Sequence, residues 1–496
     1  MTEIAADPAM AAPAGPSRWR VIRAAAAKEW TELRRDSRLV ALFGLVLLLL
    51  AGALAFGAAQ HSRLDRERDA AAAADRALWV SQGAKNPHAA AHFGQFAFKP
   101  QSLLALADPG VDAYAGSAVR LEAHRQKHPQ FRSASDNGVA ARLGGLSFAF
   151  VLQIVMPLVA ILIGFAAFAG ERERGTLRQS LSVGASGVDL LAGKALAALA
   201  ALSALLGPAF ALCAAAILLL GDHDVSVADQ LTRLAALLAG YALYLAGFVF
   251  LALAVSALAR TTRAALVILL AFWLVDGFLA PRVMTDIVER AAPLPTTQQF
   301  QKAIVDEENA LIGEDETHPA YIAFKEKALA EHGVTRIEDL PFNFGGLALR
   351  WYDETGFPIY DRHFAALQAA IDRQDRLRSA PGFLFPMLAA QPWSASLSGT
   401  DASHQSDFAA AAEAHRRRIQ TMASGDLIAN AAKGKDWDED YLSSPELWGK
   451  VPSFDYRSPD ASFALSHVRG ELAALALWAA WTLGFAIFAA RRLRPV

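Results

Sequence analysis

The segment GERERGTLRQSLSVGASGVDLLAGK, residues 170–194, is polar and charged, and long apolar runs flank it on both sides. Thr176 begins the tetrapeptide Thr-Leu-Arg-Gln, which is typical of a capping box at the start of a helix. We expect that helix to run from about Leu177 to Gly184, because a glycine often ends a helix. Ser186 opens Ser-Gly-Val-Asp directly before the next apolar run, so a second helix should begin there. The segment therefore predicts a short polar helix between two membrane spans.

The composition is that of a membrane protein with substantial polar mass besides its spans. The chain has 496 residues, of which 54% are hydrophobic and 19% are charged, and its mean hydropathy is +0.25. Its formal net charge of -2 argues against nucleic-acid binding. The only cysteine, Cys213, lies in an apolar run, which excludes a disulfide framework and a CxxC metal site.

Six apolar stretches are long enough to cross a bilayer. They are residues 39–59, 146–169, 195–220, 231–258, 264–280 and 471–490. The first stretch is longer than the core of a cleavable signal peptide, and seven basic residues precede it, so it indicates an uncleaved anchor. Residues 1–16 predict a disordered tail, and residues 17–37 predict an amphipathic cationic helix that lies at the membrane interface.

The distribution of basic residues predicts the orientation of the spans. If the spans alternate from a cytoplasmic start, the amino-terminal segment, the loop 170–194 and the tail 491–496 all lie on one side. These segments hold most of the basic residues near span ends, which the positive-inside rule places in the cytoplasm. The two long polar blocks, residues 60–145 and 281–470, then lie outside.

Because both polar blocks emerge on one face, we expect them to pack into a single domain. Helix-like stretches separated by Pro, Gly and Asp clusters occur at residues 63–80, 114–127, 297–311, 319–332, 361–379 and 403–432. The predicted fold class is mainly α: a polytopic membrane protein with six transmembrane helices and a mostly helical extracytoplasmic domain built from two insertions.

The loop between the second and third spans resembles the cytoplasmic loop of type-2 ABC transporter permeases. In that family an acidic pair, a Gly-Thr and a downstream Gly-Lys precede the third span. The matching residues here are Glu171, Glu173, Gly175, Thr176, Gly193 and Lys194. The family often has a proline where this chain has residues 184–187, Gly-Ala-Ser-Gly. The resemblance implies that the short helix docks on a separate ATPase subunit, whereas the alternative is a solvated loop whose charges only fix topology.

Three motifs of the second block look like the DUF3526 group of type-2 ABC permeases, and this likeness covers essentially the whole chain. The motifs are NFGG at 343–346, DRHF at 361–364 and SLSGTDASHQSDF at 396–408. The third is the most distinctive, and it matches the group at Gly399, Thr400, Asp401 and His404. The group has no settled substrate, so the likeness implies none.

The residues themselves leave two interpretations of this third motif. Ser398 and Gly399 suit a turn, and Thr400 or Asp401 can cap the helix that carries His404. The alternative is that Thr400, Asp401 and His404 form an extracytoplasmic contact with substrate or a partner.

Two polar residues interrupt the apolar spans. Gln153 lies in the second span and Asp276 near the outer end of the fifth. A polar group in hydrocarbon is costly, so such residues usually face protein or a water-filled path. Both are candidates to line a transport path, although Asp276 is equally well explained by a position near the outer interface. Pro157 and Pro208 predict helix kinks.

Catalytic motifs are absent from the sequence. The nearest lookalike of a phosphate-binding loop, residues 187–194, has one residue too many between its glycines and is followed by Ala195 where a hydroxyl is needed. Neither His-Glu-x-x-His nor Gly-x-Ser-x-Gly occurs. We therefore expect no catalytic site and no cofactor in this chain, with ATP and Mg²⁺ bound by the partner ATPase.

All 12 histidines fall outside the predicted spans. The pairs His88/His92 and His124/His128 have the four-residue spacing that places two imidazoles on one helical face. Because no further ligands are indicated, we expect solvated surface histidines and no metal site.

We interpret the chain as the permease subunit of an ABC transporter in the bacterial cytoplasmic (inner) membrane, with both termini in the cytoplasm. The resemblance implies export of an unidentified substrate, a separate ATPase subunit and a second permease, either another copy or a sister chain. The residues expected to couple to the ATPase are Glu171, Glu173, Gly175, Thr176, Leu177 and Arg178.

Within this group, Glu171 and Glu173 are expected to make charged contacts with the ATPase, and Arg172 or Arg174 to anchor the loop at the lipid headgroups. A first alternative is force transmission to a periplasmic partner without translocation. A second is a membrane-embedded or external hydrolase, for which the sequence lacks a nucleophile and base at recognisable spacing.

Overall fold

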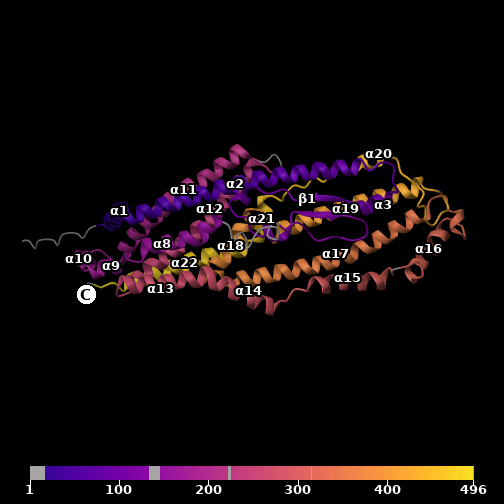
Figure 1. Cartoon of the computed structure of the whole chain (residues 1–496). Coiled ribbons are helices and arrows are strands. Elements are labelled where there is room, and N and C mark those ends of the chain that lie inside the picture. The colour runs from indigo at the N-terminus through magenta and orange to yellow at the C-terminus, as the bar shows by residue number, and fades with distance from the viewer. Residues whose placement is uncertain (1–16, 133–145, 222–224, 314, 495–496) are drawn as a thin grey trace, which may run out of the picture.

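The computed structural model describes residues 17–132, 146–221, 225–313 and 315–494. The molecule is elongated, with a bundle of apolar helices at one end and a long, mostly helical arm at the other (Figure 1). The predicted tail at residues 1–16 lies outside the described residues. The mainly α fold class is confirmed.

Within the described part of the chain, six helical segments are long and apolar enough to span a membrane, as predicted. They are α2 (Ser37–Val80), Phe148–Glu173, α11 (Gly187–Leu220), α12 (Val227–Leu258), Thr262–Ala291 and α22 (Arg469–Arg491). The second segment comprises α7 (Phe148–Phe150), the π-helical η2 (Val151–Val155), α8 (Met156–Gly164) and α9 (Ala169–Glu173). The fifth comprises α13 (Thr262–Leu274), the π-helical η3 (Val275–Leu279) and α14 (Ala280–Ala291). Helix α1 (Arg18–Arg35) precedes the bundle, and α10 (Thr176–Ser182) follows α9.

Helix α12 is the centre of the bundle. Its most apolar stretch is 67% buried, whereas that of α2 is 22% buried, so α2 leaves most of its apolar surface for lipid. Gly247 brings α22 close, because a Cβ there would lie 2.0 Å from Nε1 of Trp478. That indole nitrogen donates to the carbonyl of Tyr244 at 3.0 Å. Small residues therefore let the central helix pack against its neighbours.

The first span continues into the arm. Helix α2 runs unbroken to Val80, so the helix expected at residues 63–80 is the extension of the span. No glycine or proline interrupts residues 58–80, which favours a continuous helix. At its far end the buried Trp79 donates from Nε1 to the carbonyl of Trp448 at 3.0 Å. One rigid element thus connects the bundle to the arm.

Both polar blocks contribute to the arm. The first block provides α3 (Pro87–Phe93), β1 (Gln95–Phe98), η1 (Leu103–Leu106), α4 (Asp112–Ala115) and β2 (Ala118–Leu121). The second provides α15 (Thr297–Leu311), α16 (Pro319–Glu331), η4 (Ile337–Asp339), α17 (Phe344–Ser379), η5 (Ala380–Phe383), α18 (Met387–Leu397), α19 (Ala402–Asn430), α20 (Glu446–Lys450) and α21 (Ala461–His467). Ala97 and Leu121 of the first block share a core with Phe408 and Trp448 of the second. The two blocks therefore pack together.

The helix predicted at residues 114–127 is wrong. Gly116 ends α4 with a φ of 90°, and the chain then enters β2, which pairs antiparallel with β1. A Cβ at Gly116 would lie 2.7 Å from the carbonyl oxygen of Gln130. Pairing with a neighbouring strand has overridden the local helical tendency, as it often does for short segments.

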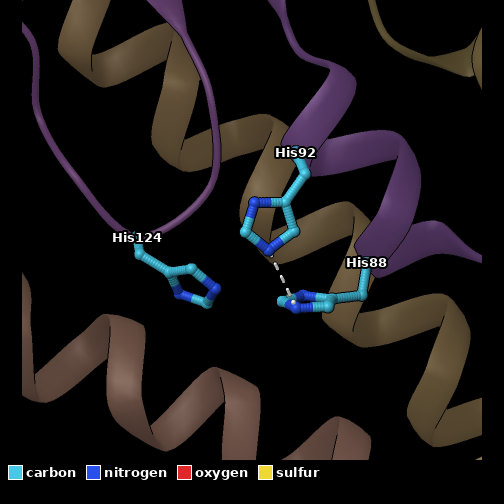
Figure 2. Close-up of side chains that lie close together, drawn as sticks. All are labelled: His88, His92 and His124. Atoms are coloured by element: carbon cyan, nitrogen blue, oxygen red, sulfur yellow. Dashed lines mark hydrogen bonds between the residues drawn. The ribbon is translucent and has the colours of Figure 1, made fainter. Parts of the chain in front are cut away.

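This change separates one of the two predicted histidine pairs. His88 and His92 lie on α3, but His124 lies in the loop after β2 with a φ of 67°. Figure 2 shows that the His124 ring points toward His88 and His92. His128 instead packs on Phe300.

The Asn-Phe-Gly-Gly motif starts α17 earlier than expected. The side chain of Asn343 accepts a hydrogen bond from the amide of Gly346 at 2.9 Å, so the helix begins at Phe344 rather than near residue 361. A Cβ on Gly346 would lie 2.7 Å from the backbone nitrogen of Ile428. The motif therefore combines a helix cap with a close approach of α19.

Helix α18 belongs to the bundle, although its sequence lies in the second polar block. Ala389, Trp393 and Leu397 are buried in the same apolar core as the spans. A Cβ at Gly240 of α12 would lie 2.0 Å from Nε1 of Trp393. The second polar block thus returns a helix to the bundle, which its hydropathy did not indicate.

Candidate coupling sites

The loop between the second and third spans lies at the end of the bundle where α1 begins and α22 ends (Figure 1). The predicted capping box does not form, because Thr176 is the first helical residue and its hydroxyl donates to the carbonyl of Glu171 at 3.3 Å. Gly175, with a φ of 76°, makes the turn that starts α10. The second predicted cap is present: Oγ of Ser186 accepts from the amide of Asp189 at 3.1 Å.

Glu171 lies in a buried cluster of ion pairs, with 3% of its surface exposed. Its Oε1 accepts from Nζ of Lys194 at 2.9 Å and also from Lys28. Lys194 in turn pairs with Glu29. Burial requires such mutual neutralisation, because an unpaired charge inside a protein is costly. The carboxylate expected to meet the ATPase therefore fastens α9 to α1 and α11.

This cluster also affects the charge of α1. Partial burial alone would lower the pKa of Lys28, but its hydrogen bond to Glu171 raises it above the ordinary value. Lys28 therefore stays positively charged at neutral pH and keeps the ion pair intact.

Gly193 explains how α1 reaches this cluster. A Cβ there would lie 2.5 Å from Cβ of Ala25 and 2.6 Å from the carbonyl oxygen of Ile22. Helix α1 therefore packs directly on the backbone of α11. Arg18 adds an ion pair to Asp189, with Nε 2.9 Å from Oδ1. The helix predicted to lie at the membrane interface is thus attached to the third span along one face.

The two residues that follow the buried glutamate cap other span ends. Arg172 donates to the carbonyls of Ala257 and Ala259, both at 2.6 Å, at the carboxyl end of α12. Glu173 accepts from the amide of Thr262 at 3.0 Å, at the amino end of α13. Each charge has the sign that its helix end favours. Arg172 therefore binds protein carbonyls instead of reaching out to lipid headgroups.

Helix α10 has one buried and one exposed face. Leu177 is 4% exposed and anchors the helix in the apolar core. Arg178 and Gln179 are exposed, and Val183 directly after the helix is 73% exposed. Helix α10 is thus firmly attached to the bundle through Leu177, and no described residue covers its other face.

The helix of the second span is interrupted between α8 and α9, and a side chain of α12 accepts the hydrogen bonds of the amides there. The amides of Phe168 and Ala169 donate to the hydroxyl of Ser256 at 3.0 and 3.1 Å. Ser256 is fully buried. A side-chain hydroxyl from a neighbouring helix here replaces the carbonyls that a continuous helix would supply.

A buried polar network connects the second span, α12 and α18. Gln153 donates from Nε2 to the Tyr241 hydroxyl at 3.0 Å, and Tyr241 donates to Oγ of Ser394 at 2.8 Å. Tyr244 donates to the carbonyl of Gln153 at 2.8 Å. Gln153 is only 7% exposed, so it faces protein in this structure.

Asp276 lies in η3 and is 1% exposed. Its Oδ1 accepts from the amide of Met387, the first residue of α18, at 3.1 Å, and a carboxylate suits that helix end. The two π-helical segments lie close together, because a Cβ at Gly277 of η3 would lie 3.2 Å from Cδ1 of Ile154 in η2. Trp273, at the end of α13, donates from Nε1 to the carbonyl of Ile154 at 2.9 Å. Such π-helical segments often occur at functional sites. Asp276 therefore attaches the fifth span to α18.

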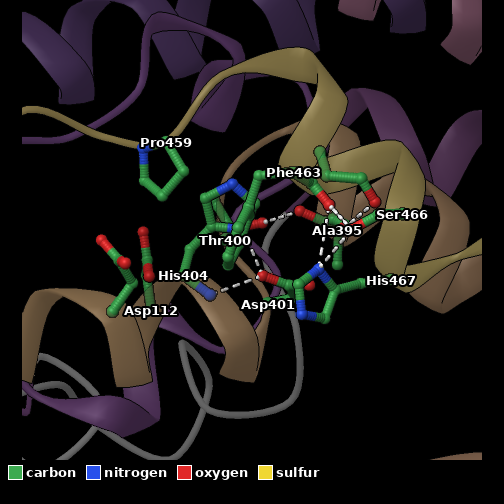
Figure 3. Close-up of polar contacts among 12 residues, drawn as sticks. Asp112, Ala395, Thr400, Asp401, His404, Pro459, Phe463, Ser466 and His467 are labelled. Carbon is green, nitrogen blue, oxygen red and sulfur yellow. Dashed lines mark hydrogen bonds and ion pairs between the residues drawn. The ribbon is translucent and has the colours of Figure 1, made fainter. Parts of the chain in front are cut away.

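The Gly-Thr-Asp-x-x-His motif lies at the start of α19, and Figure 3 shows its side chains between Pro459 and Phe463. Thr400 is fully buried, and its hydroxyl lies 3.0 Å from the carbonyl oxygen of Asp108 and 3.1 Å from that of Ala395. Asp401 caps α19 by accepting from the amide of His404 at 3.0 Å. This cap was one of the two predicted alternatives, and it places the motif between the two polar blocks.

His404 connects the motif to the fourth span. Its Nδ1 lies 2.5 Å from Oδ1 of Asp401, and its Nε2 lies 3.4 Å from Nη1 of Arg233 on α12. Arg233 is 3% exposed, pairs with Asp229 at 2.8 Å and donates to the carbonyl of Pro459. Burial alone would raise the pKa of Asp401, but the hydrogen bonds from His404 lower it. The motif residues thus form a buried joint between the arm and the spans.

Sequence reasoning missed most partners of these sites. They come from elements far apart in the chain and are Lys28, Glu29, Asp108, Arg233, Tyr241, Ser256 and Ser394. One signal was present: Asp229 and Arg233 form a charged pair at four-residue spacing at the start of an apolar span. A charge in that position needs a partner, and the pairing could have marked it.

Six apolar helices that carry a helical arm made from two insertions define a multi-pass membrane protein. A sequence model described as ABC-2 family transporter protein matches residues 23–312, more than half of the chain. The chain therefore belongs to the ABC-2 transporter family and is a membrane permease component, which implies association with an ABC ATPase. A second model, the domain of unknown function DUF3526, matches residues 296–457, most of the second block. A comparison with curated proteins gives no match.

Proposed function

We propose that the chain is a permease subunit that couples ATP hydrolysis by a separate ATPase to export of a substrate. The observation that carries this proposal is that α10 has an exposed face, while α9 directly before it is held in place by the buried ion pairs of Glu171. Export as the direction rests on the resemblance to type-2 permeases. Mg²⁺ and ATP would bind the ATPase.

The basic residues support an inner-membrane location with both termini in the cytoplasm. The bundle end that holds α10 would then face the ATPase. The exposed side chains Arg178, Gln179 and Val183 would form the contact, while Glu171 would act as a positioning residue.

Movement of α10 would reach the centre of the bundle by two routes. Through Glu171 it would act on Lys194 and hence on α11. Through Arg172 it would act on the carboxyl end of α12, whose carbonyls that guanidinium binds. Both routes are short and made of charged hydrogen bonds, which resist stretching more than apolar contacts do.

From α12 the movement would pass to the arm. Tyr241 connects α12 to α18 through Ser394, and Arg233 connects it to α19 through His404. Both contacts are buried, so they would move as a unit with the helix.

We also propose a second permease subunit, either another copy or a sister chain. The outward apolar faces of α2 and of the segment Thr262–Ala291 are suited both to lipid and to a partner helix.

The test is co-purification of the full chain with its partner ATPase in mild detergent, followed by an ATP hydrolysis assay. A double variant, Arg178→Glu with Val183→Asp, changes only exposed side chains at α10, and we expect at least a tenfold loss of bound ATPase, roughly 1.4 kcal/mol. The matched control is Arg35→Glu, an exposed charge reversal at the end of α1. Wild-type binding by the α10 variant would exclude this helix as the docking site.

The alternative is force transmission to a periplasmic partner without translocation. It is favoured by one observation: Gln153 and Asp276, the candidates for a transport path, are both engaged with protein. ATPase activity of the purified complex separates the two functions. Stimulation by a small molecule favours transport, whereas stimulation only by a periplasmic protein favours force transmission.

A further inference from the structure

Three histidines of the first polar block converge at one point of the arm (Figure 2). His88 and His92 lie one turn apart on α3, and their Nε2 atoms are 3.1 Å apart. His124 approaches from the loop after β2, and its ring centroid lies 5.1 Å from that of His88 and 5.0 Å from that of His92. One ring nitrogen of each residue lies within 4.8 Å of the other two.

Local structure holds the two helical histidines in place. Asn86 caps α3 by accepting from the amide of His88 at 2.9 Å, and Pro87 occupies the first turn. The side-chain Nδ2 of Asn86 also donates to the carbonyl of Asp438 at 3.1 Å, which ties this cap to the second block. The orientation of α3 is thus set from both sides.

The third histidine is held by backbone contacts of its neighbour. The amide of Ala123 donates to the carbonyl of Ala91 on α3 at 3.0 Å, so the loop is attached to the helix one residue before His124. His124 itself has a φ of 67°, a left-handed conformation that is uncommon for residues other than glycine. Such backbone outliers are retained mainly where the surrounding structure needs the side chain in one direction.

We propose that His88, His92 and His124 bind one Zn²⁺ ion, with the fourth coordination position open. Zinc bound tetrahedrally by imidazole has Zn–N distances of about 2.0–2.1 Å, which places ligand nitrogens about 3.3 Å apart. The two nitrogens on α3 are already close to that spacing, at 3.1 Å. Rotation of the His124 side chain would bring its ring nitrogen from within 4.8 Å to the same distance from both. Three imidazoles select zinc, copper or nickel over magnesium and calcium, which prefer oxygen ligands.

The open position has access to a cavity of roughly 910 Å³ that all three histidines line. Residues of the second block complete its lining and include the acidic side chains Glu308, Asp353 and Asp436. Acidic walls concentrate cations, although Arg125 and Lys127 partly offset them here. The site therefore combines a fixed ligand set with an entry path, and a water molecule or a small ligand from the cavity would complete the coordination.

The first measurement is the zinc content of the purified full chain in detergent, using an affinity tag that contains no histidine. After removal of metal with a chelator, we expect titration with Zn²⁺ to give about one tightly bound ion per chain. Co²⁺ in place of zinc should give the visible absorption of a tetrahedral ion. Mg²⁺ and Ca²⁺ should not compete.

The decisive variant is His124→Gly, which removes the ligand yet suits the left-handed backbone, so that loss of binding does not come from misfolding. We expect zinc affinity to fall by more than about 100-fold, beyond the loss typical of outer-shell partners. His88→Asn and His92→Asn should act similarly. The matched control is His128→Phe, which keeps the ring contacts with Phe300 and Phe364 and should bind zinc like the wild type.

Two results would overturn this site: fewer than about half an ion bound per wild-type chain at saturating zinc, or equal affinities for wild type and His124→Gly. Neither result bears on the docking of α10, since the histidines lie on the arm and the ATPase assay requires none of them.

Discussion

The ammonium nitrogen of Lys194 lies 2.9 Å from a carboxylate oxygen of Glu171, and 3% of each residue is exposed. Because Lys28 and Glu29 complete the cluster, each charge has an opposite charge beside it. Removal of one member leaves a buried charge with too few partners, and this is far more destabilising than removal of an exposed pair.

We therefore predict that Lys194→Met lowers stability in detergent by about 3–5 kcal/mol, measured as a loss of thermal stability by tryptophan fluorescence. Adding Glu171→Gln to this variant should recover part of the loss, because the uncompensated carboxylate is gone. The control is Lys302→Met, which breaks the exposed pair with Asp306 and should change stability by less than about 0.5 kcal/mol. Equal effects of the two lysine variants would contradict the role of burial.

Asp276 offers a second prediction, since its carboxylate accepts a hydrogen bond from Met387. Asp276→Asn keeps an acceptor oxygen and should retain near-wild-type stability and ATPase coupling. Asp276→Leu leaves the buried amide of Met387 without a partner and should lower the free energy of unfolding by about 1–3 kcal/mol. Should Asp276→Asn fold normally but abolish substrate-stimulated ATP hydrolysis, the charge itself would be required, and a transport role would replace the structural one.

Gly110 tests the joint between arm and spans. It has a φ of 44°, and a Cβ there would lie 2.4 Å from Oγ1 of Thr400, so Gly110→Ala adds a clash to backbone strain. We expect a loss of about 2–4 kcal/mol and faster hydrogen exchange of the amides near Thr400. Gly83→Ala is the matched control, because Gly83 also has a positive φ, 72°, but nothing within 4 Å of the added atom. Gly83→Ala should lose only the stability that backbone strain costs, about 1–2 kcal/mol. Equal losses of stability in the two variants would mean that the structure relieves the clash with Thr400 at little cost.

Asp353 gives a pH prediction for the arm. Burial raises the pKa of this carboxyl to about 6, although Arg416 acts in the other direction. The folded protein therefore holds a proton that the unfolded chain releases near pH 4, and this carboxyl reduces stability as pH rises from about 4 to 6. Asp353→Asn should be more stable than the wild type at pH 7 by roughly 1–3 kcal/mol, with a smaller difference at pH 4. The check is thermal unfolding across this range, and a difference independent of pH would refute the assignment.

Features that depend on neighbouring residues could be predicted from the sequence. Hydropathy over about 20 residues indicates a span wherever it occurs, and six spans are present in the described residues. Ser186 and Asp401 cap the helices that follow them, because the bonds involve amides three residues away. Helix α15 begins and ends at the residues that its pattern indicates, Thr297 and Leu311.

Local signals failed where another segment competed for the same backbone. Residues 118–121 pair with β1 instead of forming a helix, and Thr176 bonds backward to Glu171 instead of capping α10. The apolar core also includes α18, which comes from an otherwise polar block, because Trp393 of α18 packs against Gly240 of α12. For β2 and α18 the energy of a distant contact exceeded a weak local preference, whereas Thr176 made a different local hydrogen bond.

The sequence by itself determined which segments are apolar and long enough to cross a membrane, how the charges are distributed, and the helix caps at Ser186 and Asp401. Only the tertiary structure decided which charged and polar groups meet. Lys28 and Glu171 are 143 residues apart, Arg233 and His404 are 171 apart, and the third histidine of the proposed zinc site comes from a different element than the first two. The physical reason is that spans and caps depend on residues within a few turns, whereas buried partners are set by the packing of distant segments.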